Sequence, residues 1–442
     1  MADKRGIGTF VNELHELASD SIDLYTIPPI DKSHIHGKEQ TLYPTSVLTS
    51  EGPIEFLIPS DSTDFTALHL TRLEGEIEIV KSSDGTALAA TDKISIVNLL
   101  PHALFKQIEC SIKDIQINDL STPTYPYKSF IETHLTYSPD LKKTTLKDCE
   151  CYIPDTAGKE NSILLSGDDI NKGFVERQKL FIGKKINFSI VPHIDFFQSP
   201  RLLIPGCDIK LKFIRSDDSF CLIQETPIGK IKINNLRLRV RRITLDPSYA
   251  SMILNKLNST PVAYPIVSSK IKTSLINSGV KLQQISQMVR GKLPRSFLLC
   301  FVSAKAFDGN VNKNPFVFEN FKINYLNVFL NGEAINPTVF QPEFTTENYT
   351  REYRWFLDNI GLHQHFTNGV TKEDFKNNSC FFPFDLSPDL CNNVILQGIQ
   401  EGTIDVHVGF ETPLTENIYC LMLGSYDEMI SIDKNRNVII SS

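Results

Sequence analysis

Two His-x-His pairs are the first residues in this sequence whose spacing suggests chemistry. His34/His36 and His363/His365 could each place two imidazoles on one face of a strand. Zinc needs three or four ligands, and neither pair has a cluster of carboxylates or thiols beside it in the sequence. We therefore expect solvated loop histidines and no metal site.

The cysteines show no zinc or disulfide pattern. Cys149 and Cys151 are separated by one residue and have no second pair nearby, so a zinc site is not expected. The chain has nine cysteines in all. An odd number spread over a long chain is typical of reduced thiols inside a cell. The N-terminus lacks the apolar run of a secretory signal, which agrees with synthesis in the cytosol.

Two acidic pairs, Asp168/Asp169 and Asp217/Asp218, raise the possibility of glycosidase chemistry, which needs two carboxylates about 5–10 Å apart. Asp-rich loops between strands are also ordinary turn chemistry. The sequence contains no phosphate-binding loop, no GxSxG elbow, no HExxH and no paired CxxC. We therefore predict that the protein is not an enzyme, with no catalytic, cofactor-binding or metal-binding residues.

Residues 230–242 form a basic stretch. Arg237, Arg239 and Arg241 alternate with apolar residues, so they share one face of a predicted strand. This face could meet nucleic-acid phosphates. The interpretation we favour is a solvated face, or arginines paired with acids across a subunit interface, because no aromatic stacking residues are interleaved and the formal net charge is -7.

The elements that position these residues are mostly strands. The chain has 442 residues, of which 41% are hydrophobic and 22% charged, a composition that predicts a folded protein of more than one domain. No run of about 18 apolar residues occurs, so no membrane span is expected. Period-two alternation, the pattern of half-buried antiparallel strands, occurs at residues 54–58, 68–80, 108–117, 186–191, 209–214, 231–240, 297–302, 321–330, 404–408 and 418–423. Helical spacing is confined to residues 8–19, 125–136, 246–258 and 348–360.

An internal repeat with a period near 200 residues gives the domain organisation. Residues 206–213 and 220–223 match residues 402–410 and 419–422. Upstream, the aromatic helices at 125–131 and 349–356 each follow a hairpin-like strand, and we expect them to occupy equivalent places. The pattern predicts an all-β protein of two tandem jelly-roll β-sandwiches, with short helices in the loops.

We expect three parts: an N-terminal arm at residues 1–45, a first jelly roll at 46–226 and a second at 227–442. In the arm, Phe10, Leu14 and Leu17 recur at helical spacing, and Pro28 and Pro29 disfavour a central strand. The arm could contact a neighbouring subunit or another protein of the same assembly. It could also be a disordered leader or a helix packed on its own subunit.

Nine short motifs, in order along the chain, resemble the major capsid protein of Polinton (Maverick) elements and the related adintoviruses. They are Ser21–Ile30, Gly52–Pro59, Tyr125–Thr133, Asp155–Lys159, Asp195–Gln198, Arg215–Phe220, Lys313–Phe316, Phe384–Asp389 and Ile432–Val438. The resemblance covers residues 21–440, and residues 139–175 and 259–295 match it less clearly.

The resemblance implies a double jelly-roll capsid protein of the adenovirus-hexon lineage. Such a protein forms homotrimers of pseudo-hexameric outline that tile an icosahedral shell, and its partners would be neighbouring capsomers, penton and minor capsid proteins. It implies location in the virion after synthesis in the host cytoplasm, with assembly in the cytoplasm or nucleus. Genome contact through the shell interior would not be specific. The alternatives are a double-sandwich glycan hydrolase or a glycan-binding module.

Overall fold

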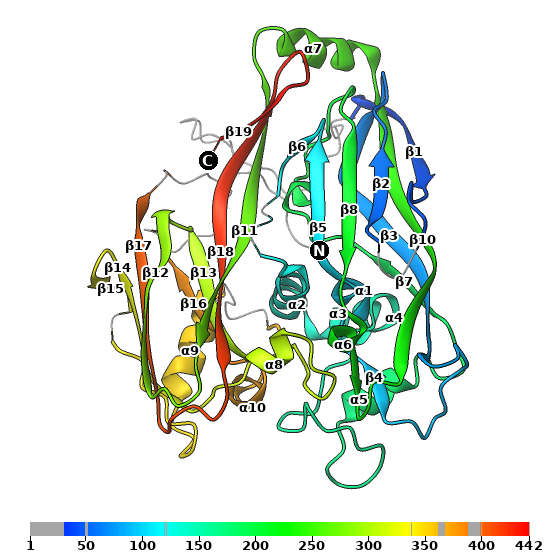
Figure 1. Cartoon of the computed structure of the whole chain (residues 1–442). Coiled ribbons are helices and arrows are strands. Elements are labelled where there is room, and N and C mark those ends of the chain that lie inside the picture. The colour runs from blue at the N-terminus through cyan, green and yellow to red at the C-terminus, as the bar shows by residue number, and fades with distance from the viewer. Residues whose placement is uncertain are drawn as a thin grey trace, which may run out of the picture.

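Two β-sandwiches stand side by side in the computed structural model (Figure 1). The structure describes residues 31–48, 52–118, 120, 122–336, 338–360, 367–387, 398 and 400–441. The predicted helix at residues 8–19 lies outside this part of the chain. One continuous cluster of buried apolar residues runs through both sandwiches, so the two halves share a core.

The first sandwich consists of two four-stranded antiparallel sheets. One sheet has the order β1–β10–β3–β7 and the other has the order β2–β8–β5–β6. The strands are β1 (His34–Leu42), β2 (Ile54–Ile58), β3 (Phe65–Lys81), β5 (Phe105–Ile112), β6 (Ile115–Gln116), β7 (Ile186–Ile190), β8 (Ile209–Arg215) and β10 (Gly229–Leu245). A short ladder of β4 (Ile94–Ile96) and β9 (Leu222–Gln224) lies beside them.

The second sandwich repeats this arrangement. Its sheets have the orders β11–β18–β13–β16, with β19 added to β18, and β12–β17–β14–β15. The strands are β11 (Val262–Ile276), β12 (Leu282–Lys292), β13 (Ser296–Ser303), β14 (Ile323–Leu330), β15 (Glu333–Ala334), β16 (Phe382–Asp385), β17 (Glu401–Phe410), β18 (Ile418–Ile432) and β19 (Val438–Ser441).

The two sandwiches are topologically equivalent, which confirms the predicted tandem jelly rolls. In each, the first, eighth, third and sixth strands form one sheet, and the second, seventh, fourth and fifth form the other, if the β4–β9 ladder and β19 are set aside. The repeat at residues 206–213 and 402–410 corresponds to β8 and β17. Residues 220–223 differ, because they end in β9 and pair with β4, whereas residues 419–422 lie inside β18.

The helices lie mostly in the loops. They are α1 (Leu100–Ala103), α2 (Tyr125–Thr136), α3 (Pro139–Lys143), α4 (Thr145–Glu150), α5 (Lys172–Gln178), α6 (Asp218–Cys221), α7 (Pro247–Leu257), α8 (Ala304–Phe307), α9 (Thr350–Asn359) and α10 (Lys372–Asn377), with a 3-10 turn η1 (Asp195–Gln198). Helices α2 and α9 both stand between the fifth and sixth strands of their sandwich, so the two aromatic helices occupy equivalent places, as expected.

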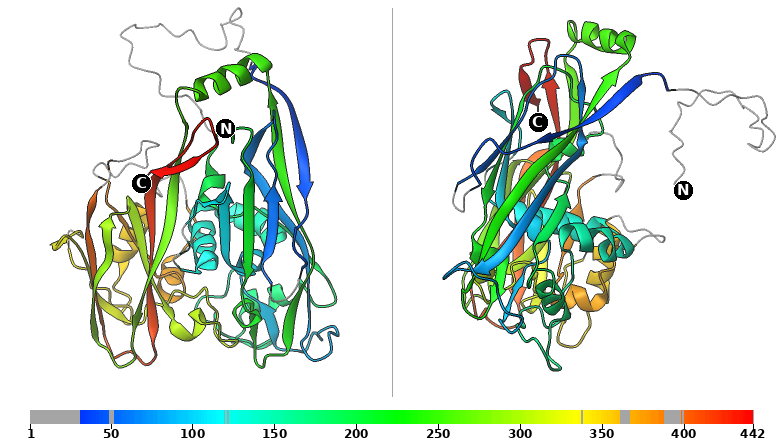
Figure 2. Two further views of the ribbon diagram at one scale, coloured as in Figure 1. Left: turned by 45° about the horizontal axis from the view of Figure 1, so that its top comes forward. Right: turned by 90° about the vertical axis from the view of Figure 1, so that its right-hand side faces the viewer.

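The structure differs from the expected boundary between residues 226 and 227. Strand β10 is hydrogen-bonded along its length between β3 and β1, and it therefore completes the first sandwich. The chain then passes through α7, which spans the ends of the two sandwiches (Figure 2), and the second sandwich begins at β11. Hydrogen-bond pairing, which the sequence pattern does not report, decides this division.

The expected arm of residues 1–45 is also shorter than predicted. Residues 34–42 form β1, which pairs with β10 from His34↔Leu245 to Leu42↔Leu238. The prolines at positions 28 and 29 precede this strand in the sequence, so they do not prevent it from joining the sheet. Among the described residues, β1 is an edge strand whose other side has no strand neighbour.

Candidate functional site: the junction between the two sandwiches

An aromatic cluster on helix α2 joins the two sandwiches. Pro126 suits the first turn of α2, where its missing N–H costs no hydrogen bond. The next turn presents Tyr127 and Phe130, both buried, to the chain that follows β13. The ring of Phe130 stacks on Phe316 with centroids 4.5 Å apart and an interplanar angle of 1°, and Tyr127 stacks on Phe307 at 5.2 Å. Aromatic stacking in a desolvated site therefore contributes to holding the sandwiches together.

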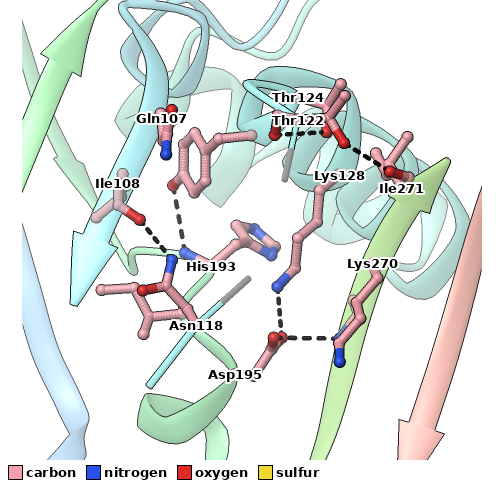
Figure 3. Close-up of a pocket in the computed structure, with 13 residues that line it drawn as sticks. Gln107, Ile108, Asn118, Thr122, Thr124, Lys128, His193, Asp195, Lys270 and Ile271 are labelled. Atoms are coloured by element: carbon pink, nitrogen blue, oxygen red, sulfur yellow. Dashed lines mark hydrogen bonds and ion pairs between the residues drawn. The ribbon is translucent and has the colours of Figure 1, made fainter. Parts of the chain in front are cut away.

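A buried ion pair lies beside this cluster. Lys128 of α2 donates to the carboxylate of Asp195 in η1, and Asp195 Oδ2 accepts a hydrogen bond from the backbone N–H of Ser269 in β11 at 3.1 Å. Figure 3 shows the side chains of Lys128 and Asp195 pointing toward each other. Burial raises the pKa of Asp195, and the nearby Lys128 ammonium opposes this effect. One carboxylate thus links α2, η1 and the second sandwich.

A small cavity adjoins the ion pair. Its volume is about 50 Å³, and its lining includes Lys128, His193, Asp195 and Lys270. This volume exceeds what one water molecule needs, so the polar cavity can hold ordered water. It is too small to admit a sugar or a nucleotide.

A carboxylate, an imidazole and a hydroxyl stand in line at the same junction. His193 Nδ1 lies 2.6 Å from Glu132 Oε2, and His193 Nε2 lies 3.2 Å from Thr133 Oγ1. Burial by itself would raise the pKa of Glu132. The nearby Lys128 and His193 favour the carboxylate more strongly, so the pKa of Glu132 lies below its usual range. Such a set could activate a hydroxyl nucleophile, but Thr133 is completely buried and has no route to a substrate. The arrangement is therefore structural.

A second imidazole packs against the first. The rings of His102 and His193 lie 5.0 Å apart at an angle of 70°. His102 Nδ1 is 3.0 Å from the Tyr125 hydroxyl, and its Nε2 is 3.4 Å from Glu150 Oε2. Burial lowers the pKa of His102, so this ring is kept neutral in the folded protein.

His134, near the end of α2, bridges the sandwiches directly. Its Nδ1 lies 2.8 Å from the hydroxyl of Tyr152 in the first half, and its Nε2 lies 3.1 Å from Ser379 Oγ in the second half. Burial lowers the pKa of His134 to about 3. This inter-sandwich contact therefore depends on a neutral imidazole.

A third polar link centres on Asp155. Its Oδ1 accepts from Arg177 at 2.6 Å, and its Oδ2 accepts from the Asn314 side-chain amide at 2.8 Å. Arg177 is wholly buried, and its Nε donates to the Ile96 carbonyl at 2.8 Å. Asn314 comes from the second half of the chain, so this guanidinium–carboxylate pair extends across the junction.

Four of the nine motifs that carry the sequence resemblance contribute polar residues to this junction. Lys128, Asp155, Asp195 and Asn314 each lie in one of them, and the polar links above connect them in pairs. Arg436, from the last motif, donates to the Pro205 carbonyl at 2.7 Å. The sequence assigned no role to these side chains, because partners far apart in the chain have no diagnostic spacing. Their membership in the ordered motifs was the one sequence signal that could have pointed to these four residues.

The predicted histidine pairs do not form a site within the described residues. His34 begins β1, with its Nδ1 2.8 Å from Ser33 Oγ and 3.2 Å from Asp31 Oδ2, and His36 follows on the same strand. Both are exposed, as expected, but they lie on a strand and not in a loop. His363 and His365 lie outside the described part of the chain. In the part that the structure describes, no group of three or more His, Cys, Asp or Glu residues could hold a metal ion.

Cys149 and Cys151 have separate environments. Cys151 ends helix α4 in a left-handed conformation and is buried, and burial raises the pKa of its thiol. Cys149 is half-exposed on the helix itself. Both thiols are free, as are the six other described cysteines. Cys391 lies outside the described residues.

The two acidic pairs considered for glycosidase chemistry lie in a loop and at the start of a short helix. Asp168 and Asp169 are exposed, and Lys159 Nζ lies 3.2 Å from Asp169 Oδ1. Asp217 precedes α6, and Asp218, the first residue of α6, lies 3.7 Å from Arg215. Neither pair lines one of the cavities described here.

Two other carboxylates share a wider cavity. Glu160 and Glu319 line a space of about 470 Å³, and burial raises the pKa of each. They are far apart in sequence, so no spacing could have paired them.

The arginines of β10 pair with acids of their own chain. Arg237 Nε lies 2.8 Å from Glu74 Oε2 on β3, and Arg239 lies 3.4 Å from the same carboxylate. Arg239 and Arg241 also lie 3.6 Å and 3.9 Å from Glu39 on β1. The acids belong to the neighbouring strands, so this face is a partly neutralised surface of one sheet. No helix among the described residues is long and apolar enough to cross a membrane.

Comparison with known proteins identifies the fold. No family model matches the chain. A Caenorhabditis elegans protein designated uncharacterized protein F54H12.2 is 23% identical over 411 residues, which is 89% of this chain and 94% of that protein.

Solved structures of low sequence identity match over nearly the whole chain. A chain of the Sputnik virophage structure has a TM-score of 0.60 at 11% identity and covers 97% of this chain and 93% of its own. The Faustovirus major capsid protein has a TM-score of 0.59 at 9% identity, covering 97% and 93%. The mavirus major capsid protein has a TM-score of 0.55 at 10% identity, covering 100% and 96%. The fold is therefore the all-β double jelly roll of these capsid proteins, which are structural rather than catalytic.

Proposed function

We propose that this chain is a major capsid protein, the structural subunit of an icosahedral shell. The observation that carries the proposal is the pair of equivalent jelly rolls that fills the chain, a fold shared with solved capsid proteins over at least 97% of its length. The Polinton and adintovirus lineage remains the finer part of the proposal, and it rests on the nine motifs in order.

The buried junction supports this role. A shell subunit has to present fixed surfaces to its neighbours. A hinge between the sandwiches would let the relative positions of these surfaces vary. The stacked Phe130–Phe316 pair and the hydrogen bond from Ser269 to Asp195 oppose such a hinge. Moving the sandwiches apart would expose the two rings and leave the Asp195 carboxylate without the Ser269 donor.

Trimerisation is the assembly step we propose. The open side of β1 leaves backbone groups without a strand partner among the described residues, and natural proteins cover or blunt such edges. A closed ring of three subunits covers them without forming fibres, and permanent interfaces of this kind bury about 2,000 Å² or more. Two sandwiches in each of three subunits give the pseudo-hexameric outline that tiles a shell.

The partners we propose follow from that role. Each trimer would contact neighbouring capsomers, and penton and minor capsid proteins would complete the shell. The protein would reside in the virion after synthesis in the host cytoplasm, and assembly would take place in the cytoplasm or the nucleus. Any contact with the genome would come from the shell interior and would not be sequence-specific.

Light scattering after size-exclusion chromatography, with negative-stain microscopy of the same fractions, tests the proposal. We expect a mass of three times 49.9 kDa and particles of hexagonal outline that assemble into shells. A stable monomer at micromolar concentration would overturn the trimer.

Glycan turnover assayed on the same material tests the alternative glycan-related roles. Loss of that turnover in Glu160→Gln or Glu319→Gln, the carboxylates of the 470 Å³ cavity, would favour a hydrolase. We expect no turnover in the unmodified protein.

A further inference from the structure

Helix α7 carries more apolar surface than the body of the protein covers. One face packs on the core through a buried leucine and three partly buried neighbours, namely Leu257, Ala250, Ile253 and Leu254. On the shoulder of that face, Tyr249 and Met252 are 43% and 60% exposed. They lie one turn apart and continue the apolar stripe. A second helix could lie along this shoulder.

The opposite side of α7 is polar. Ser248, Ser251 and Asn255 are exposed and recur at intervals of three and four residues, so they share one face. Lys256 follows Met252 on the apolar shoulder, where its aliphatic stem can extend the surface. The helix therefore has a directional apolar shoulder and is not apolar all round.

The first described residues lie beside the start of α7. Asp246 caps α7, its side chain accepting from Ser248 N at 2.9 Å. The backbone N–H of the same Asp246 donates to the Ser33 carbonyl at 2.9 Å. The start of β1 is thus close to the first turn of α7 (Figure 2), and thirty residues of the sequence precede the described ones. Ile35, 62% exposed, adds apolar surface at the same end of the sandwich.

The length of that segment matches the site. Residues 8–19 have helical spacing of Phe10, Leu14 and Leu17, and twelve helical residues span about 18 Å, against about 16 Å for α7. The eleven residues between 19 and 31 can reach at most about 36 Å. An antiparallel arrangement brings residue 19 near the first turn of α7, well within that reach.

We propose that residues 8–19 form an amphipathic helix that packs antiparallel on the Tyr249–Met252 shoulder of α7 in the same chain. The same chain is favoured because a short tether holds the segment at a local concentration of about a millimolar or more. A marginal helix of twelve residues needs an apolar surface to persist, and α7 offers one at the exit point. This inference does not depend on the capsid role.

A cysteine cross-link tests the contact in the full-length protein. In the antiparallel register Leu14 lies against Met252, so Leu14→Cys combined with Met252→Cys should form a disulfide under mild oxidation. The matched control is Leu14→Cys with Ser251→Cys on the polar side of α7, which should react at least about tenfold more slowly. The single variants account for the native thiols.

The mass of the product decides between the possible partners. A cross-link within one chain keeps the mass of a single chain on denaturing gels and supports the proposal. A product of twice that mass would place the segment on a second copy and overturn it, as would equal reaction of the two pairs or no reaction in either.

Limited proteolysis gives a readout that does not need cysteines. Met252→Glu should raise the rate of chymotryptic cleavage after Phe10 by about tenfold, because the uncovered segment becomes accessible, whereas Ser251→Glu should leave the rate unchanged. Equal cleavage rates in the unmodified protein and Met252→Glu would contradict docking on α7. Circular dichroism of both variants checks that the sandwiches remain folded.

Discussion

Truncating Phe316 tests whether the junction makes one cooperative unit of the two sandwiches. Phe316 belongs to the second half of the chain, but its ring stacks face to face on Phe130 of α2 in the first half at 4.5 Å. Both rings are more than nine-tenths buried. The substitution Phe316→Ala therefore removes a contact between the sandwiches and leaves the strands of each sandwich intact.

The cost can be worked from this geometry. Truncating a fully buried phenylalanine destabilises a protein by about 3–5 kcal/mol, through lost burial and the cavity left behind. The stacked pair adds about 0.5–1.5 kcal/mol that neither ring provides alone. We expect the free energy of unfolding to fall by about 4 kcal/mol, within that range, in Phe316→Ala. The double-mutant cycle with Phe130→Ala should return a coupling of about 1 kcal/mol.

Urea unfolding at one fixed protein concentration measures both quantities. The chain has a single tryptophan, Trp355 in α9, whose fluorescence reports the second sandwich, whereas far-ultraviolet circular dichroism reports both. If the junction couples the sandwiches, the two signals move together to lower urea. The matched control is Phe329→Ala on the partly exposed side of β14, which should cost about 1 kcal/mol or less.

Two results would refute the reasoning. One is a loss in Phe316→Ala no larger than that in Phe329→Ala. The other is a shift of the fluorescence signal alone while the dichroism keeps a separate transition at the original urea concentration. That outcome would mean that the sandwiches unfold independently.

Three further predictions concern polar groups of the same molecule. Burial lowers the pKa of His134 to about 3 in the folded protein. Below pH 6.5 this histidine is therefore protonated in the unfolded chain but stays neutral in the native protein. Stability is thus lost as pH falls, by about 2 kcal/mol between pH 6.5 and 5, and denaturation of His134→Asn should show a loss smaller by that amount. Arg177→Met leaves the largely buried carboxylate of Asp155 without its guanidinium and should lower the free energy of unfolding by about 3–5 kcal/mol. An unchanged urea midpoint would contradict this. Trp355 is half-buried, and its Nε1 donates to the Pro383 carbonyl at 2.7 Å, so Trp355→Phe should cost about 1–3 kcal/mol in thermal unfolding, whereas no change would show that the bond contributes nothing.

Strands with one buried face could be predicted from the sequence alone. In β10 the leucines at 236 and 238 are completely buried, whereas Arg237 between them is exposed and Arg239 after them is half-exposed. The pleat produces this alternation wherever one face meets a core, so the signal is local. The tandem repeat was equally readable, because β8 and β17 have the same place in the two topologies and keep similar alternation.

Strand β1 shows what local pattern cannot report. Its residues 34–42 are all exposed or half-exposed, so they carry no buried alternation, and only the register with β10 makes them a strand. The expected domain boundary at 226/227 was wrong for the same reason, because only its pairing with β1 and β3 assigns β10 to the first sandwich. Each sheet is closed by a partner more than a hundred residues away, and no window of sequence contains both members of the pair.

The junction depended most on tertiary structure. The sequence by itself determined the all-β class, the duplication and the order of the motifs. It could not determine that Ser269 donates to Asp195, or that Asp155 meets Asn314. These contacts arise because the two sandwiches pack with one particular relative orientation, and that orientation is decided by the summed burial of the aromatic cluster around Phe316 and not by any local propensity.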